Sequence, residues 1–150
     1  MVFFPEKIRI RVIDSYTHES ISNIVVSIKL FANHKSDYVF ILPISDKSGI
    51  IEFTRKWLNE EIQKERNLFI MDYSSDLDDC RSKIELRILD VESLKKAINA
   101  MNMYKNALGI SQKEIDKISN AINGEYYSET KEVELRDENS IDIELLTKRF

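Results

Sequence analysis

Residues 7–13 read Lys7-Ile8-Arg9-Ile10-Arg11-Val12-Ile13, so apolar and basic side chains alternate along them. Successive side chains of a β-strand point to opposite faces, and this period of two therefore predicts a strand with one buried and one solvent-facing side. Three more segments rich in β-branched and aromatic residues follow at 24–31, 38–42 and 50–54. Their composition predicts three further strands, with 24–31 and 38–42 in the centre of a sheet.

Polar turns separate these strands, and their order resembles the prealbumin-like β-sandwich modules. These are the carboxypeptidase regulatory-like and Cna-B-like domains, which are related in shape to transthyretin. The matching features are the strand end Val12-Ile13-Asp14, the turn with Thr17, the segment Ile21-Ser22-Asn23-Ile24-Val25-Val26, and Ser45-Asp46-Lys47-Ser48-Gly49. The resemblance covers the first third of the chain and implies a binding, spacer or accessory module rather than a catalyst.

The pattern changes after residue 54. Residues 55–66 carry apolar side chains at helical spacing and predict a short amphipathic helix, and the apolar run 67–73 and the alternating run 83–89 predict two strands. Asp90 and Gly109 have the residue types that cap a helix over 91–108. Ser111 and Glu114 have capping-box spacing ahead of a second helix that the pair Asn123-Gly124 stops. These two helices form a predicted hairpin.

Alternating apolar residues return near the end of the chain. Val133 and Leu135 predict one closing strand, and Ile141, Ile143 and Leu145 predict another, with a polar turn at 137–140 between them. The fold class expected is therefore α+β, a mainly antiparallel β-sandwich with a helical hairpin insertion. We expect one domain over residues 1–150, with sandwich strands at about 7–89 and 130–146 and the helical insertion at about 90–123.

Composition and charge narrow the classes of function. The chain has 150 residues, of which 43% are hydrophobic, with a net charge of −4. The acidic balance disfavours nucleic-acid binding, because such proteins concentrate basic residues on one surface. No apolar run approaches the roughly 20 residues of a membrane helix, and the first residues do not resemble a signal peptide, so we expect a cytoplasmic protein. Cys80 is the single cysteine, and we expect a buried structural thiol.

The acidic loop 72–79 is the sharpest candidate for chemistry. Its four carboxylates, Asp72, Asp76, Asp78 and Asp79, are the ligand type that calcium prefers. The spacing is not that of an EF-hand, since the central glycine and the terminal glutamate are missing, and a solvent-exposed hydrogen-bonded turn is the alternative. A small hydrolase with Asp72 or Asp76 as its base is a further alternative, although no nucleophile stands beside them.

Tyr126 and Tyr127 are the candidate interaction residues. Neighbouring side chains of an extended segment face opposite sides, so one of the two rings should stay accessible. Together with the missing catalytic set, these features predict a noncatalytic protein-interaction or accessory module that needs no cofactor and binds another protein. Self-association through sheet edges stays open as an additional property. A cation-dependent binding domain and a small hydrolase are the alternative functions.

Overall fold

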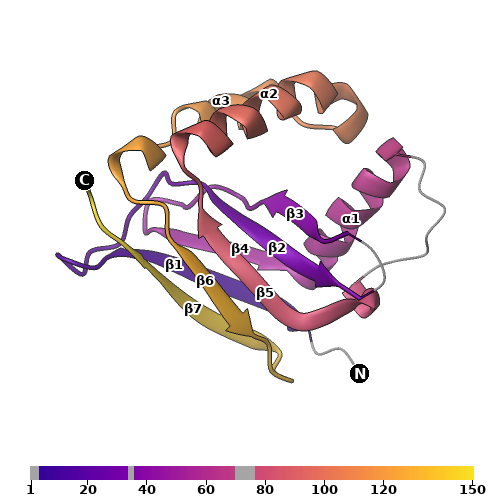
Figure 1. Ribbon diagram of the computed structural model, residues 1–150, viewed down its shortest axis with the longest axis horizontal. Helices are drawn as coiled ribbons and strands as arrows, with labels where there is room; N and C mark the ends of the chain where they lie inside the picture. The colour runs from indigo at the N-terminus through magenta and orange to yellow at the C-terminus, as the bar shows by residue number, and fades with distance from the viewer. Residues whose placement is uncertain (1–3, 34–35, 70–76) are drawn as a thin grey trace.

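The computed structural model describes residues 4–33, 36–69 and 77–150, without the side chains of residues 65–69 and 78. Seven strands in these residues form two sheets (Figure 1). The three-stranded sheet has the order β4-β1-β7, and the four-stranded sheet has the order β3-β2-β5-β6. The strands are β1 (Lys7–Asp14), β2 (Val26–Ala32), β3 (Tyr38–Ile41), β4 (Ile50–Thr54), β5 (Cys80–Ile88), β6 (Thr130–Glu134) and β7 (Ser140–Thr147). The predicted α+β class with a sheet-rich core is confirmed.

The strand pairs are antiparallel with one exception. β1 and β7 run parallel, in a register that extends from Lys7 opposite Ser140 to Asp14 opposite Thr147. Parallel neighbours need a crossover connection, and here the crossover contains all the elements between the two strands. The opening strand is therefore held between β4 and the last strand of the chain.

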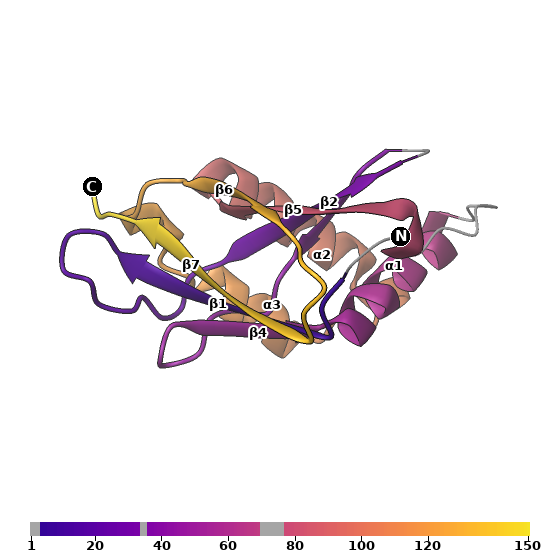
Figure 2. The ribbon, with the colours of Figure 1, turned by 90° about the horizontal axis from the view of Figure 1, so that it is seen from below.

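The core fills the space between the two sheets, which lie as separate layers in Figure 2. In β1, Ile8, Ile10 and Val12 are buried, whereas Arg9 and Arg11 are exposed, as the alternation predicts. β2 and β5 also direct a row of apolar side chains into the core. The largest fully buried side chains of these two strands are Ile28, Leu30, Ile84, Leu86 and Ile88.

Two expectations for the strands and helices are wrong. α1 (Arg55–Phe69) follows β4 directly and continues past residue 66, so residues 67–69 are helical rather than part of a strand. No glycine or proline interrupts residues 55–69, and each further helical residue adds a backbone hydrogen bond. The rest of that expected strand, 70–73, lies outside the described residues. β3 is an edge strand rather than a central one, because only β2 pairs with it in the described chain.

The helical hairpin consists of α2 (Val91–Leu108) and α3 (Gln112–Ser119). Both predicted caps are present: the Asp90 side chain accepts a hydrogen bond from Ser93 N, and the Ser111 side chain accepts one from Glu114 N. Gly109 ends α2 in the left-handed conformation at φ 68°. α3 ends at Ser119, ahead of the predicted stop, and a short 3₁₀ turn, η2 (Asn123–Glu125), follows.

The hairpin packs where β2 begins and β5 ends, above the sheets in the view of Figure 1. Val25, Leu89, Leu94 and Ile118 form a second buried cluster there. Ile41 at the end of β3 packs against the same cluster. The hairpin therefore stands beside the β3 edge of the four-stranded sheet.

Candidate functional site

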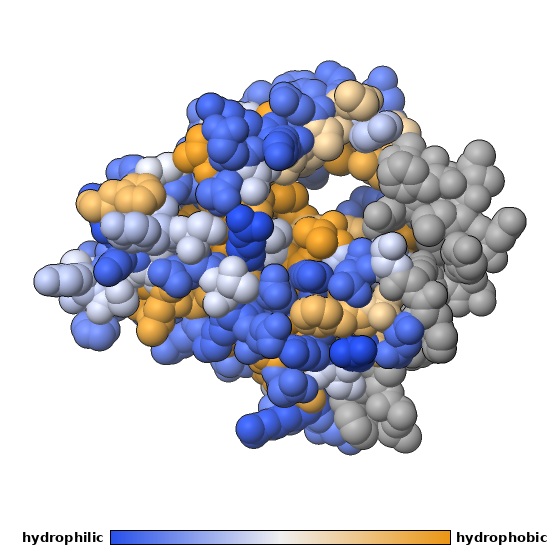
Figure 3. Space-filling view, in the orientation of Figure 1, coloured by the Kyte–Doolittle hydropathy of each residue, from blue (hydrophilic) through white to orange (hydrophobic). Residues whose placement is uncertain are grey.

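A groove of about 480 Å³ lies between β3, α1 and the α2–α3 hairpin. Figure 3 shows this hollow below the hairpin, with apolar side chains along its border. Its apolar lining comes from β3 and the residues after it, from one residue of α1, and from the hairpin. The apolar side chains are Val39, Phe40, Ile41, Leu42, Pro43, Ile44, Trp57, Met101, Leu108, Ile110 and Ile118.

β3 lines this groove and pairs on one side only, with β2, among the described strands. The backbone N–H of Leu42 donates to Val26 O at 2.9 Å, and the register places Phe40 opposite Ile28. Hydrogen-bonded and non-hydrogen-bonded pairs alternate along an antiparallel ladder. Val39 and Ile41 therefore direct their backbone N–H and C=O groups away from β2, toward the open edge.

β3 differs from the other edge strands in having no charged side chain. β6 carries Lys131, Glu132 and Glu134, whereas β3 reads Tyr-Val-Phe-Ile. Charged residues on an edge strand prevent it from pairing with another chain. β3 lacks this protection, and the side chain of Val39 is 60% exposed. The β3 edge is thus chemically suited to accept another strand.

Among the described side chains of the groove, the charged ones are on α1 and α3. Trp57, Glu61 and Lys64 are spaced by four and three residues, which places them on one face of α1. Lys64 Nζ lies 3.2 Å from Glu61 Oε1. Glu114 and Lys117 stand on α3 across the groove. The described part of the lining thus contains two acids and two bases.

A second hollow, of about 820 Å³, lies along the polar side of α1. Its lining includes the exposed residues Arg55, Lys56 and Glu60, and Arg55 Nη1 donates to Phe4 O at 3.0 Å. This surface has the character of a solvated helix face. We therefore assign the candidate site to the groove beside β3, which three separate parts of the fold enclose, although it is the smaller of the two hollows.

The acidic loop falls largely outside the described residues. Asp72 and Asp76 lie in the part of the chain that is not described, and Asp78 lies in the 3₁₀ turn η1 (Leu77–Asp79) without a described side chain. Asp79 is partly buried, and its backbone oxygen accepts a hydrogen bond from Asn33 N at 2.9 Å. Within residues 4–33, 36–69 and 77–150, no three His, Cys, Asp or Glu side chains gather as metal ligands do. The calcium site and the hydrolase base stay predictions.

Tyr126 and Tyr127 lie away from the groove, beside the last residues of the chain. Tyr126 is 8% exposed and Tyr127 is 42% exposed, so one ring is accessible, as the sequence predicts. The Tyr127 ring lies 4.5 Å from that of Phe150, and Tyr127 N donates to Lys148 O. Tyr126 forms a β-bridge with Arg149, so both tyrosines contact the last residues of the chain, and Tyr127 keeps part of its ring on the surface. Its interaction role stays a prediction.

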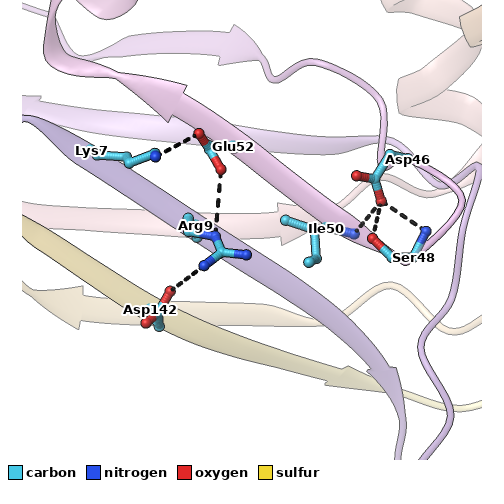
Figure 4. A network of polar contacts seen from close by, with 7 residues as sticks. All are labelled: Lys7, Arg9, Asp46, Ser48, Ile50, Glu52 and Asp142. Atoms are coloured by element: carbon cyan, nitrogen blue, oxygen red, sulfur yellow. Dashed lines mark hydrogen bonds and ion pairs between the residues drawn. The ribbon is translucent and has the colours of Figure 1, made fainter.

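The outer face of the three-stranded sheet is charged, and four of its charged side chains form ion pairs (Figure 4). Glu52 lies 3.0 Å from Lys7 Nζ and 3.4 Å from Arg9 Nε, and Asp142 lies 4.0 Å from Arg9 Nη1. Beside these pairs, the Asp46 carboxylate accepts hydrogen bonds from the Ser48 side chain and from Ile50 N, which hold the pKa of Asp46 below its ordinary value. This face is a solvated ionic surface.

Comparison with known proteins returned no relative. No family model, curated protein or solved structure matches this chain. Among the described helices, none is both long and apolar enough to cross a membrane. A proposal for the function of this protein therefore has to be argued from the structure of the groove.

Sequence reasoning missed the β3 edge because it placed residues 38–42 in the centre of a sheet. An uncharged, apolar strand is equally typical of a central position, where both neighbours protect the backbone. The available signal was Pro43, which has no N–H to donate and is found at the edges and ends of strands. That signal identifies a strand end but does not show which elements stand beside it.

Proposed function

We propose that this protein is a noncatalytic protein-interaction module whose binding site is the groove between β3, α1 and the α2–α3 hairpin. The observation that carries the proposal is the uncharged strand β3, which pairs only with β2 among the described strands and lines a groove rich in apolar side chains. An unprotected edge strand is a liability in solution unless pairing with a partner is its use. Peptide recognition commonly combines an edge of this kind with apolar pockets.

The chemistry of the lining favours binding over catalysis. The titratable side chains among its described residues are Glu61, Lys64, Glu114 and Lys117, and Glu61 is already paired with Lys64. No serine, threonine, cysteine, histidine or aspartate is among the described residues that line the groove. A nucleophile with an adjacent base is thus missing from this lining. The groove offers apolar side chains together with polar and charged surface in similar amounts.

The interpretation of the opening strands as a prealbumin-like module also implies an accessory or binding role. That interpretation stays a prediction. It agrees in kind with a noncatalytic module, although it names no partner and no surface. The groove adds a specific location to the proposal.

A peptide-display selection on the immobilised protein tests the proposal. We expect enrichment of apolar peptides on the wild-type protein and loss of that enrichment in Leu108→Lys, because Leu108 is a half-buried part of the lining. Met103→Lys is the matched control, since Met103 is on the same helix, is 72% exposed and lies outside the groove. A Lys near the end of α2 does not oppose the helix dipole.

Circular dichroism first establishes that both variants are folded. Equal enrichment on wild type and Leu108→Lys would contradict the groove as the binding site. Absence of any enriched peptide on the wild-type protein would contradict a peptide-binding function altogether.

A further inference from the structure

We propose that Asn123 is a covalent modification site, whose side-chain amide is hydrolysed when the hairpin junction opens and whose product then opposes closure of the junction. The hairpin junction is η2 together with the hydrogen bonds from Asn123 to Val25 and Leu89. This proposal is independent of the proposed function of the groove. It follows from three features: the residue after Asn123, the conformation of η2, and the partners of the Asn123 side chain.

The sequence makes Asn123 the asparagine best placed to lose its amide. It is the one asparagine that a glycine follows, Gly124. In an open chain the Gly124 nitrogen gives its proton to solvent and attacks Cγ of Asn123. The N–Cγ bond forms, the Cγ–Nδ2 bond breaks, and Nδ2 takes a proton and leaves as ammonia. Glycine favours this attack, because it has no side chain to hinder the approach and its backbone rotates freely.

Water completes the reaction. The intermediate is a five-membered imide, in which the Gly124 nitrogen is bonded to Cγ and to the main-chain carbonyl carbon of residue 123. Water adds to one of these two carbons, and the bond from that carbon to the nitrogen breaks. Hydrolysis at Cγ gives aspartate, whereas hydrolysis at the main-chain carbon gives isoaspartate. Overall, one water is consumed, one ammonia is released, and a neutral amide becomes a carboxylate.

The conformation of η2 prevents this attack in the folded protein. Tyr126 N donates to Asn123 O at 3.2 Å, and Glu125 N donates to Ile122 O at 3.0 Å, so Asn123 is held in a 3₁₀ turn. In such a turn ψ is roughly −25°. The Gly124 nitrogen reaches Cγ only after a large rotation about ψ of Asn123. That rotation breaks the turn.

The side chain of Asn123 is also held and shielded. Nδ2 donates to Val25 O at 2.8 Å and to Leu89 O at 2.9 Å, and Oδ1 accepts from Val25 N at 2.9 Å. Departure of Nδ2 would break two of these hydrogen bonds. Asn123 is 1% exposed, so its amide is closed to solvent. The reaction therefore has to begin from a state in which the hairpin junction is open.

The product does not fit the site that the amide occupied. An ionised carboxylate has no hydrogen to donate, and at position 123 it would face two carbonyl oxygens, Val25 O and Leu89 O. A buried charge without a partner is strongly unfavourable. Isoaspartate in addition lengthens the main chain by one carbon. Opening of the junction thus permits the reaction, and the product opposes closing.

Peptide mass spectrometry after incubation at pH 8 tests the proposal. The folded protein is compared with the same protein in guanidinium chloride above its unfolding transition. Asn139 is the internal control, because it is exposed and a serine follows it. In denaturant we expect Asn123 to react at least threefold faster than Asn139, and in Gly124→Ala at least fivefold more slowly than in the wild type. In the folded protein the ratio of the Asn123 rate to the Asn139 rate should fall at least tenfold.

Refolding of the modified chain tests the effect of the product. Ion-exchange chromatography isolates the chain modified at Asn123, since it carries an additional negative charge. We expect it to unfold at a lower urea concentration than unmodified protein taken through the same denaturation, whereas a chain modified at Asn139 alone should match the unmodified protein.

Three results would each overturn the proposal. The first is an Asn123 that reacts no faster than Asn139 in denaturant, and the second is a ratio of the two rates that folding leaves unchanged. The third is equal urea midpoints for the unmodified chain and the chain modified at Asn123. All three measurements are independent of peptide binding in the groove.

Discussion

Asn123 and Val25 exchange two hydrogen bonds across almost a hundred residues of chain. Asn123 Nδ2 donates to Val25 O at 2.8 Å, and Val25 N donates to Asn123 Oδ1 at 2.9 Å. The same Nδ2 donates to Leu89 O at 2.9 Å, and Asn123 is 1% exposed. One buried amide thus ties the chain after the helical hairpin to the start of β2 and the end of β5. These hydrogen bonds hold the helical hairpin, which forms one wall of the groove, in place relative to the four-stranded sheet.

The substitution Asn123→Leu should destabilise the fold by about 2–4 kcal/mol, because it leaves the buried N–H of Val25 and the buried C=O of Leu89 without their partner. Val25 O keeps the hydrogen bond from Leu89 N at 3.3 Å. Leucine has a similar size, so loss of volume is a small part of the effect. Urea unfolding followed by circular dichroism measures the change. Asn106→Ala, an exposed position on α2, is the control and should change stability by less than about 0.5 kcal/mol. Equal losses of stability in the two variants would contradict a stabilising role of the Asn123 hydrogen bonds.

Replacing Gly49 by alanine should destabilise the protein more than replacing Gly109. Both glycines have positive φ, 77° and 68°, so alanine is strained at each by roughly 1 kcal/mol. At Gly49 an added Cβ would also lie 2.8 Å from Ser20 Cβ and 2.9 Å from Ile21 O, whereas at Gly109 nothing lies within 4 Å. We expect losses of about 1 kcal/mol for Gly109→Ala and at least about 2 kcal/mol for Gly49→Ala. Thermal unfolding of both variants tests this order, and the reverse order would be incompatible with the close approach at Gly49.

Asp90 should make stability depend on pH in the acid range. The Ser93 N–H donates to its carboxylate and, with Arg87 nearby, lowers the pKa of Asp90 below its ordinary value of 3.8. A lowered pKa favours the charged form in the folded state, so the stabilisation is full above the unfolded pKa and is lost as pH falls through the folded pKa.

Unfolding free energies of the wild type and Asp90→Asn from pH 2 to pH 6 provide the measurement. The wild type should be the more stable protein near pH 6, and the difference should shrink steadily below about pH 4. Asp137→Asn, in the loop before β7, is the matched control. A constant difference between wild type and Asp90→Asn across this pH range would count against the assignment.

Glu52→Gln should cost little, and the cost should depend on salt. Glu52 bridges Lys7 and Arg9 on the outer face of the three-stranded sheet, where all three side chains are close to half exposed (Figure 4). Exposed ion pairs contribute under ~1 kcal/mol and are screened by salt. Urea unfolding at low salt and in 1 M NaCl should show a small loss that disappears at high salt. A large loss that persists in 1 M NaCl would mean that this face is part of a tighter interaction.

The features that sequence reasoning predicted correctly depend on neighbours along the chain. The buried row of β1 follows from the alternation of residues 7–13, and both helix caps, at Asp90 and Ser111, follow from residue type and spacing. The extension of α1 over residues 67–69 was missed because a short apolar run fits a buried strand and a helix equally well. For the groove, sequence showed the apolar strand at 38–42 and the amphipathic helices, but not that they meet.

The amino-acid sequence by itself determined the strand and helix periodicities, the caps and the buried faces, since each depends on backbone geometry within a few residues. Only the tertiary structure decided that β3 is an edge, that β1 runs parallel to β7, and that Asn123 binds Val25. These relationships join residues that are far apart in sequence, and their partners are selected by packing of the whole core rather than by local preference. The groove belongs to this second group, because its lining comes from β3, α1 and the hairpin together.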